Sequence, residues 1–209
     1  RNTYIFSTGP VGSRITLRAT ARSADESFFE TEKVFTINDV DILWSSETTV
    51  PLWYKGKALA SAGSTITLSA LPEVRRGGLK IPTDRLVYRW NIDGQLLADV
   101  SGAGRNIISF RAANAPADFE HEITLEVLDL TGNAGAQKTI NIALVNPEIS
   151  FYEEHPLEGT LNNLALAGIS MSAGEEKEFR SSPYFFSRGE PITYEWLIDR
   201  KRVENEGGA

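Results

Sequence analysis

The sequence predicts an all-β protein made of antiparallel β-sandwiches that repeat along the chain about every 105 residues. Three observations lead to this prediction. Short segments alternate apolar and polar residues, turn-forming residues separate these segments, and a tryptophan-containing motif occurs twice at a spacing of 106 residues. Together they indicate a two-layered β structure that is built more than once.

The alternation is clearest between Leu86 and Ile92. Tyr88 and Trp90 fall on one face of this segment and Arg89 falls on the other, which is the pattern of a half-buried strand. The same period of two predicts further strands at Thr65–Ala70, Ile107–Phe110, Glu122–Leu128 and Gln137–Val145. Short strands at this density are typical of a sandwich, and we expect Trp90 to fill its centre.

Residues that favour turns separate the predicted strands. Glycine adopts positive φ at little cost, and aspartate and asparagine bond readily to nearby backbone amides. Such residues form the segments Arg76-Gly77-Gly78, Asp93-Gly94, Ser101–Gly104 and Thr131–Asn133. Their positions between the alternating segments favour antiparallel strands over helices.

An internal repeat divides the chain. The segment Leu86–Asp93 recurs as Ile192–Asp199, which places Trp196 in the position of Trp90. Shorter matches keep the same order with offsets of 104 to 111 residues; they pair Arg1-Asn2 with Arg105-Asn106, Ile15–Leu17 with Ile123–Leu125, Phe35–Ile37 with Ile140–Ile142, and Ala62-Gly63 with Ala173-Gly174. Because the offset is nearly constant, these matches indicate a repeated structural unit.

The phase of the repeat predicts three parts. Residues 39–145 form a complete sandwich, residues 1–38 form the last strands (E, F and G) of a preceding unit, and residues 146–209 form the first strands (A, B and C) of a following unit. We expect the cores to contain Tyr88, Trp90, Ile92, Tyr194, Trp196 and Ile198. Half a sandwich leaves its core open and its edges unpaired. Either neighbouring repeats of a longer chain or other copies of this chain therefore complete the two halves.

Composition argues against several classes of function. The net charge of −7 and the pI of about 5.0 argue against a nucleic-acid partner, because such proteins concentrate Lys and Arg on one face. The absence of cysteine excludes disulfides, cysteine-ligated metals and thiol catalysis. No apolar stretch is long enough to cross a membrane, so we expect no membrane insertion in this segment. The chain begins at Arg1, and we expect any signal peptide or anchor to lie outside it or to have been removed.

The sequence contains no recognisable catalytic constellation. Its two histidines, His121 and His155, are expected on the surface, and neither has the spacing of a metal-binding motif. No Gly-x-Ser-x-Gly elbow is present. We therefore predict a protein that is not an enzyme and that has no resident cofactor.

Carboxylates near the two predicted joints between units are the main candidates for metal binding. They are Asp39 and Asp41 at the first joint, and Glu148, Glu153 and Glu154 near the second. Calcium takes several oxygen ligands, and at joints it can stiffen a surface array. The spacing lacks an Asp-x-Asp-x-Asp-Gly loop, however, so ordinary solvated charges are the competing interpretation.

Aromatic residues give a candidate binding surface. Trp53 and Tyr54 lie in a loop-like insertion from Thr49 to Lys57, and Trp44 precedes it. Exposed aromatic rings can stack on sugar rings, so Trp53 and Tyr54 are candidate ligand contacts. The competing interpretation is that they pack onto the sandwich, since large aromatic side chains are usually buried.

Two motifs resemble those of known surface modules. Tyr88–Gly94 resembles the Tyr-x-Trp-x-x-Asp-Gly strand and turn of PKD-like and bacterial Ig-like domains, and Glu126–Asn133 is similar to strand F and the F–G turn of the same modules. Tyr194–Asp199 repeats the first motif, with Arg200 in place of glycine. The chain has neither the cysteine pair nor the tyrosine corner of antibody domains, and both families stay open. The resemblance implies spacing, adhesion or assembly at a bacterial cell surface rather than catalysis.

These observations predict a structural extracellular protein of the bacterial surface, a stalk or filament of tandem Ig-like repeats. Its expected partners are copies of itself or neighbouring repeats of a longer chain, and half-units that complete one another in trans would give a head-to-tail filament. The alternative is an adhesin-type module that recognises a surface glycan or protein through Trp53 and Tyr54.

Overall fold

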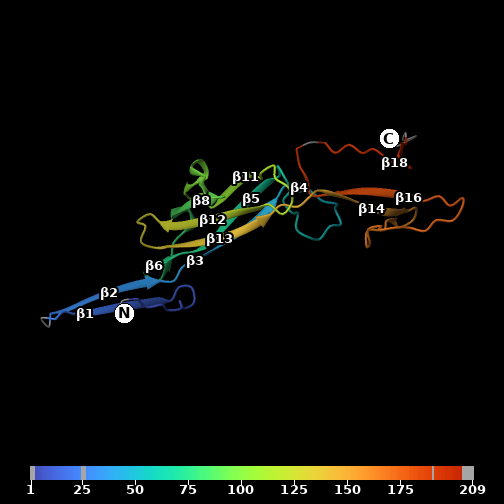
Figure 1. Cartoon of the computed structure of the whole chain (residues 1–209). Helices are drawn as coiled ribbons and strands as arrows, with labels where there is room; N and C mark the ends of the chain where they lie inside the picture. The colour runs from blue at the N-terminus through green and yellow to red at the C-terminus, as the bar shows by residue number, and fades with distance from the viewer. Residues whose placement is uncertain (1–2, 25–26, 190, 204–209) are drawn as a thin grey trace.

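The computed structural model describes residues 3–24, 27–189 and 191–203, and these residues form an all-β structure of antiparallel sheets. The described residues contain no α-helix, only two short 3-10 turns. Figure 1 shows three parts in a row: a hairpin near the N-terminus, a two-layered body in the middle, and a further sheet toward the C-terminus. The predicted match of Arg1-Asn2 and the last residues of the third part, 204–209, lie outside the described residues.

The middle part consists of two sheets, an arrangement compatible with a β-sandwich. The first contains β3 (Asp39–Ser46), β5 (Thr65–Glu73) and β11 (Ile107–Arg111), in the order β11-β5-β3. The second contains β8 (Leu86–Ile92), β9 (Gln95–Leu96), β10 (Gly102–Ala103), β12 (Glu120–Asp129) and β13 (Gly135–Ala143). Its order is β10-β8-β12-β13, with β9 paired to the end of β8.

Apolar side chains from both sheets form one buried core. The buried members of this core all come from residues 40–144, and the largest of them, Trp90 and Tyr88, are fully buried. Trp90 Nε1 donates a hydrogen bond to the Arg105 carbonyl (2.9 Å), so the one polar atom of the side chain is satisfied inside the core. Tyr88, Trp90 and Ile92 are all buried, and the alternation predicted for this segment is present in β8.

A buried carboxylate fixes the turn between β12 and β13. Asp129, whose side chain is only 4% exposed, accepts a hydrogen bond from the Thr131 hydroxyl (2.7 Å) and lies 3.2 Å from the Arg76 guanidinium. It also accepts hydrogen bonds from the backbone amides of Asn133 (2.8 Å) and Ala134 (3.2 Å). Burial by itself raises the pKa of Asp129, but these hydrogen bonds and the arginine charge outweigh burial and hold the pKa below its ordinary value.

The part near the N-terminus is an antiparallel hairpin of β1 (Arg14–Arg22) and β2 (Phe28–Thr36). Its register places Ile15 opposite Phe35, and Phe29 lies on the same face. No second layer covers that face within the described residues, and Phe29 and Phe35 are 64% and 47% exposed. A two-stranded ribbon buries little apolar area by itself, so the hairpin presents an open apolar face.

The C-terminal part is a sheet of β14 (Glu148–His155), β15 (Gly159–Thr160) and β16 (Glu178–Tyr184), in the order β15-β14-β16. β14 pairs with β16 in the antiparallel sense, as β3 pairs with β5. One face of this sheet carries Ile149 and Phe151, which are 47% and 44% exposed. On β3 and β5 the apolar face is covered by the second sheet, and here that cover is missing from the described residues.

Short strands and turns complete the structure. β4 (Thr48–Thr49) pairs with β17 (Phe186–Ser187), β6 (Arg75–Arg76) pairs with β7 (Leu79–Lys80), and β18 (Leu197–Ile198) pairs with β19 (Lys201–Arg202). The 3-10 turns are η1 (Thr83–Arg85) and η2 (Ala98–Val100). The β4–β17 pair joins the middle part to the C-terminal part.

The core residues predicted for the third part do not lie in a core. Tyr194 and Ile198 are 48% and 66% exposed, and Trp196 is only half-buried, with its ring 5.6 Å from that of Phe151. The reason is that no strand of a second layer pairs with their segment among the described residues; Leu197 and Ile198 pair only within the β18–β19 hairpin. The predicted burial of Tyr194, Trp196 and Ile198 is therefore wrong for the chain by itself.

The β18–β19 hairpin nevertheless has the backbone structure of the β8–β9 hairpin. In both, the strand enters a turn at an aspartate of positive φ, and Asp93 and its repeat counterpart have φ of 52° and 51°. The Leu97 amide donates to the Trp90 carbonyl at 2.9 Å. The Val203 amide donates to the Trp196 carbonyl at the same 2.9 Å distance. The two hairpins thus share a turn conformation and a closing hydrogen bond.

Candidate functional site

Aromatic side chains build the joint between the middle part and the C-terminal sheet. Trp53 packs edge to face with Tyr152 of β14, with ring centroids 5.7 Å apart. Tyr54 packs in the same way with Tyr184 of β16 (5.5 Å) and with Phe185 (5.9 Å). The joint is therefore a second apolar cluster, separate from the sandwich core, whose partly buried members are Val50, Trp53, Tyr54, Leu59 and Val145.

Two tyrosine hydroxyls are paired inside this cluster. The hydroxyl oxygens of Tyr152 and Tyr184 lie 2.6 Å apart, and both residues are buried. Burial and the hydrogen bond with Tyr152 together raise the pKa of Tyr184 to about 12. The Tyr184 hydroxyl therefore stays protonated near neutral pH, and the pair gives the joint one directional contact within an apolar setting.

Backbone hydrogen bonds reinforce the aromatic joint beside the β4–β17 pair. The Phe185 amide donates to the Thr49 carbonyl (2.7 Å), and the Arg188 amide donates to the Glu47 carbonyl (3.1 Å). Phe185 has a φ of 61°, a left-handed conformation that costs a bulky residue about 1–2 kcal/mol. Such a conformation persists only where surrounding contacts hold it, so the joint fixes the bend between β16 and β17.

The three aromatic residues that the sequence suggested as a binding surface lie in two different places in the structure. Trp53 and Tyr54 are half-buried, but they pack on the C-terminal sheet and not on the sandwich, which is where the packing interpretation had placed them. Trp44 instead packs against the sandwich core, and the Lys57 ammonium lies 3.0 Å from its ring centroid; burial lowers the pKa of this lysine. Among the ring contacts of the described residues none joins any two of Trp44, Trp53 and Tyr54, so they form no shared platform for a sugar.

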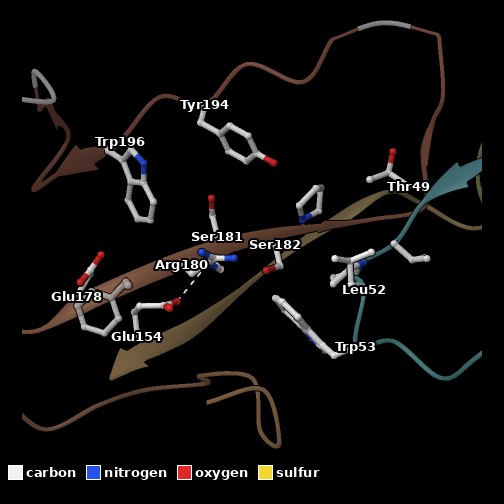
Figure 2. A pocket seen from close by; sticks show the side chains of 14 residues that line it. Thr49, Leu52, Trp53, Glu154, Glu178, Arg180, Ser181, Ser182, Tyr194 and Trp196 are labelled. Atoms are coloured by element: carbon white, nitrogen blue, oxygen red, sulfur yellow. Dashed lines mark ion pairs between the residues drawn. The ribbon is translucent and has the colours of Figure 1, made fainter. Parts of the chain in front are cut away.

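A groove of about 660 Å³ lies beside the joint, along the outer edge of β16 (Figure 2). Loop residues 49–53 form one side, and Tyr194 and Trp196 of the C-terminal segment form the other. The ion pair between Glu154 and Arg180 (3.1 Å) also lines it. The groove therefore combines apolar walls, a charged pair and a strand edge.

That strand edge carries no partner within the described residues, since β16 is the last strand of its sheet and pairs only with β14. In the middle part the corresponding strand is β5, and β11 occupies its outer edge, with Ile108 opposite Leu68 and Phe110 opposite Ile66. An unpaired edge presents N–H and C=O groups that can accept another strand, although Pro183 in this edge has no N–H to donate. The groove is thus a candidate site for strand addition.

Carboxylates expected at the joints are mostly paired with cations. The ion pairs are Asp41–Lys138 (3.5 Å), Glu153–Lys177 (2.9 Å) and Glu154–Arg180 (3.1 Å). Asp39 accepts a hydrogen bond from the Val40 amide (2.8 Å). In the part of the chain that the structure describes, no three candidate ligand side chains come together as a metal site requires. Calcium at the joints remains a prediction.

His121 is buried, contrary to the surface position expected for it. Its ring packs edge to face with Phe110 and Phe119, and its Nε2 accepts the Ala113 amide (3.1 Å). Nδ1 lies 2.7 Å from an Asp93 carboxylate oxygen and therefore carries the proton that it donates. Both nitrogens are engaged in holding the sandwich together. The alternation of β12, which puts His121 on the apolar face of the strand, is the sequence signal for this position.

No family model matches the sequence, and no curated protein matches it. Within the described residues, no helix is both long enough and apolar enough to span a membrane. The joint, the groove and the internal repeat are therefore the features from which a function can be inferred.

Proposed function

We propose that this chain is a structural segment of an extracellular bacterial surface protein, a stalk or filament built from tandem Ig-like or PKD-like sandwiches. The observation that carries the proposal is the joint, where aromatic packing and strand pairing hold the two-sheet middle part against the C-terminal sheet. An array that keeps its units apart at a surface needs such joints, because flexible linkers let neighbouring units move independently.

The strand order of the middle part supports the Ig-type arrangement. β3, β5 and β11 correspond to strands A, B and E of one layer, and β8, β12 and β13 correspond to C, F and G of the other. Trp90 lies in the core at the position of the strand C tryptophan, and a parallel bridge joins Ser61 to Val145. This order does not distinguish Ig-like from PKD-like modules, and the proposal covers both.

The chemistry of the described side chains favours a structural role over catalysis. His121 has both ring nitrogens engaged, and the Tyr152–Tyr184 pair is buried in the joint. The groove follows a strand edge rather than surrounding an activated nucleophile and its base.

Removing the aromatic rings of the joint tests the proposal directly. Replacing Trp53 and Tyr54 together by alanine leaves the sandwich core intact, so we expect the main unfolding transition to stay. Small-angle X-ray scattering should show a wider spread of molecular dimensions, because the C-terminal sheet loses its packing. Leu52→Ala is the matched control, since Leu52 belongs to the same loop and is fully exposed. Identical profiles for the double variant and the wild type would contradict the proposal.

An adhesin-type module is the second candidate, because the groove brings Trp53, Tyr194 and Trp196 to its walls. Aromatic side chains with polar tips can bind a glycan or a protein at such a site. Loss of glycan-array binding in Trp53→Ala, with the sandwich still folded, would support this function. If the wild-type chain binds no glycan and no host protein, the adhesin function is contradicted and the structural role is the one that stands.

A further inference from the structure

We propose that the groove along β16 is a strand-acceptor site whose occupant is the N-terminal part of a second copy of this chain. In this arrangement residues 3–7 of one copy pair with the edge of β16 of another, and the β1–β2 hairpin covers the open apolar face of the C-terminal part. The inference rests on the proposed repeat architecture and adds to it a partner and a register.

The complete middle unit shows what fills the corresponding groove. There β11 occupies the edge of β5, and the offset of the Arg-Asn match places residues 3–7 at the positions of β11. Tyr4 and Phe6 then take the places of Ile108 and Phe110, which are buried and partly buried against the core. In the chain by itself Tyr4 and Phe6 are 81% and 41% exposed. The segment thus has the apolar alternation of an edge strand and lacks the core that would cover it.

The β1–β2 hairpin supplies the missing layer. It matches the β12–β13 hairpin in sequence and in antiparallel pairing. In the middle unit Leu125 of β12 lies opposite Trp90 of β8. The repeat offsets place Leu17 of the donor copy opposite Trp196 of the acceptor copy in the same way. Completion would bury the face of Trp196 that is open in the single chain.

The two halves of one molecule cannot complete each other. Figure 1 shows the β1–β2 hairpin and the C-terminal sheet at opposite ends of the middle part. The occupant of each half must therefore come from outside these residues, and the proposal assigns it to a second copy of the chain. Because the donor and acceptor surfaces differ, each copy can give at one end and receive at the other, and repetition of this contact gives an open head-to-tail polymer.

Charge favours this pairing of ends. Residues 1–38 contain five Lys or Arg and four Asp or Glu, whereas residues 146–209 contain six Lys or Arg and twelve Asp or Glu. A weakly basic donor thus meets a strongly acidic acceptor, which speeds encounter and disfavours acceptor–acceptor contacts. We expect the association to slow as salt is raised, because screening weakens attraction between exposed charges.

Complementary variants test the proposal in solution. Leu17→Glu places a charge on the donor face, and Trp196→Glu places one on the acceptor face. We expect the average mass of the wild-type chain, 23.0 kDa as a monomer, to rise with concentration in light scattering, and each variant alone to stay monomeric. An equimolar mixture should form a species of two chains, since each variant keeps the surface that the other needs. An unchanged unfolding transition of the sandwich controls for misfolding.

Cysteine pairs test the register, because the natural chain has no cysteine. The proposed register places Thr16 of one copy opposite Leu197 of the next. Oxidation of the Thr16→Cys/Leu197→Cys variant should give a ladder of covalent multimers. Thr20→Cys/Leu197→Cys is the control, since Thr20 lies on the same face about 13 Å farther along the strand, and it should give no ladder.

Three results would overturn the proposal: a wild-type chain that is monomeric at every concentration, complementary variants that do not associate, or a ladder of equal strength in the control pair. If the wild-type chain stays monomeric, neighbouring repeats of a longer chain would be the source of the strands that complete the two halves. The proposed role of the joint is tested separately, because the scattering comparison of the Trp53 and Tyr54 variants is made on dilute protein and does not depend on association.

Discussion

The β12–β13 hairpin and the β1–β2 hairpin share an Ile-Thr-Leu sequence and the same antiparallel pairing, yet only the first is buried. Ile123 and Leu125 are completely buried in the sandwich core, whereas Phe29 and Phe35 on the apolar face of the other hairpin are largely exposed. The β12–β13 hairpin faces a second sheet across the core, whereas no second layer covers the β1–β2 hairpin within the described residues. The comparison teaches that the alternation of a strand sets which face can enter a core, and that a second layer decides whether it does.

The largest contrast is expected between the two repeated tryptophans. Trp90→Ala should lower the free energy of unfolding by about 3–5 kcal/mol, because it empties the centre of a packed core. Trp196→Ala in dilute protein should change it by less than about 0.5 kcal/mol, because the half-buried ring lies on an open face. Denaturant titration at low protein concentration measures both values.

Either of these two changes in the free energy of unfolding could contradict the contrast between Trp90 and Trp196. A cost below about 1 kcal/mol for Trp90→Ala would show that β8 does not direct its tryptophan into a core. A large cost for Trp196→Ala in a monomeric sample would show that the C-terminal part has a core of its own.

A smaller contrast is expected between the two hairpin turns. Asp129→Asn should destabilise the sandwich by about 1.5–3 kcal/mol at neutral pH, because it weakens hydrogen bonds that a buried carboxylate accepts. The β1–β2 turn contains a backbone bond from the Ser23 amide to the Ser27 carbonyl (2.9 Å). Ser23→Ala keeps that bond, and its effect should stay below about 0.5 kcal/mol.

The Asp129 contribution should also depend on pH in one direction. Its folded pKa lies below the unfolded value of about 3.9. The stabilisation is therefore fully present above that unfolded value and is lost as the pH falls through the lower folded pKa. Unfolding titrations of wild type and Asp129→Asn from pH 7 to pH 2 should converge at the acid end. A constant difference over this range would contradict the role given to the carboxylate charge.

The smallest effect is expected at the turns of the two repeated tryptophan hairpins. Gly94 has a φ of 79°, and its counterpart Arg200 has a φ of 65°. A residue with a Cβ at such a φ costs about 1 kcal/mol, so Arg200→Gly should stabilise the β18–β19 hairpin by about that amount. Slower hydrogen exchange of the Val203 amide, which closes this hairpin, would report the gain. Faster exchange would contradict the assignment of strain to Arg200.

The sequence predicted the middle part well because its signals are local. The alternation around Trp90 and the turn at Asp93-Gly94 define β8 and its hairpin without knowledge of any distant residue. The burial of His121 follows from the same rule, since the residue is in phase with Ile123 in β12, but its isolation among charged residues favoured a surface position.

The joint could not be predicted in the same way. Trp53 and Tyr54 pack on Tyr152 and Tyr184, which lie 99 and 130 residues farther along the chain, and no periodic pattern links the two segments. The exposure of Tyr194 was missed for a related reason. A repeated motif indicates a strand with a core-facing side, but it does not provide the second layer that covers that side.

Hydrogen exchange of the two matched hairpins over a dilution series tests the central claim most directly. The amides of β12–β13 should be protected at every protein concentration, because they open only when the sandwich unfolds. The amides of β1–β2 should exchange rapidly in dilute protein and become protected as the concentration rises and another copy covers the hairpin. Equal protection of the two hairpins in dilute protein, or β1–β2 exchange that is independent of concentration, would contradict the account.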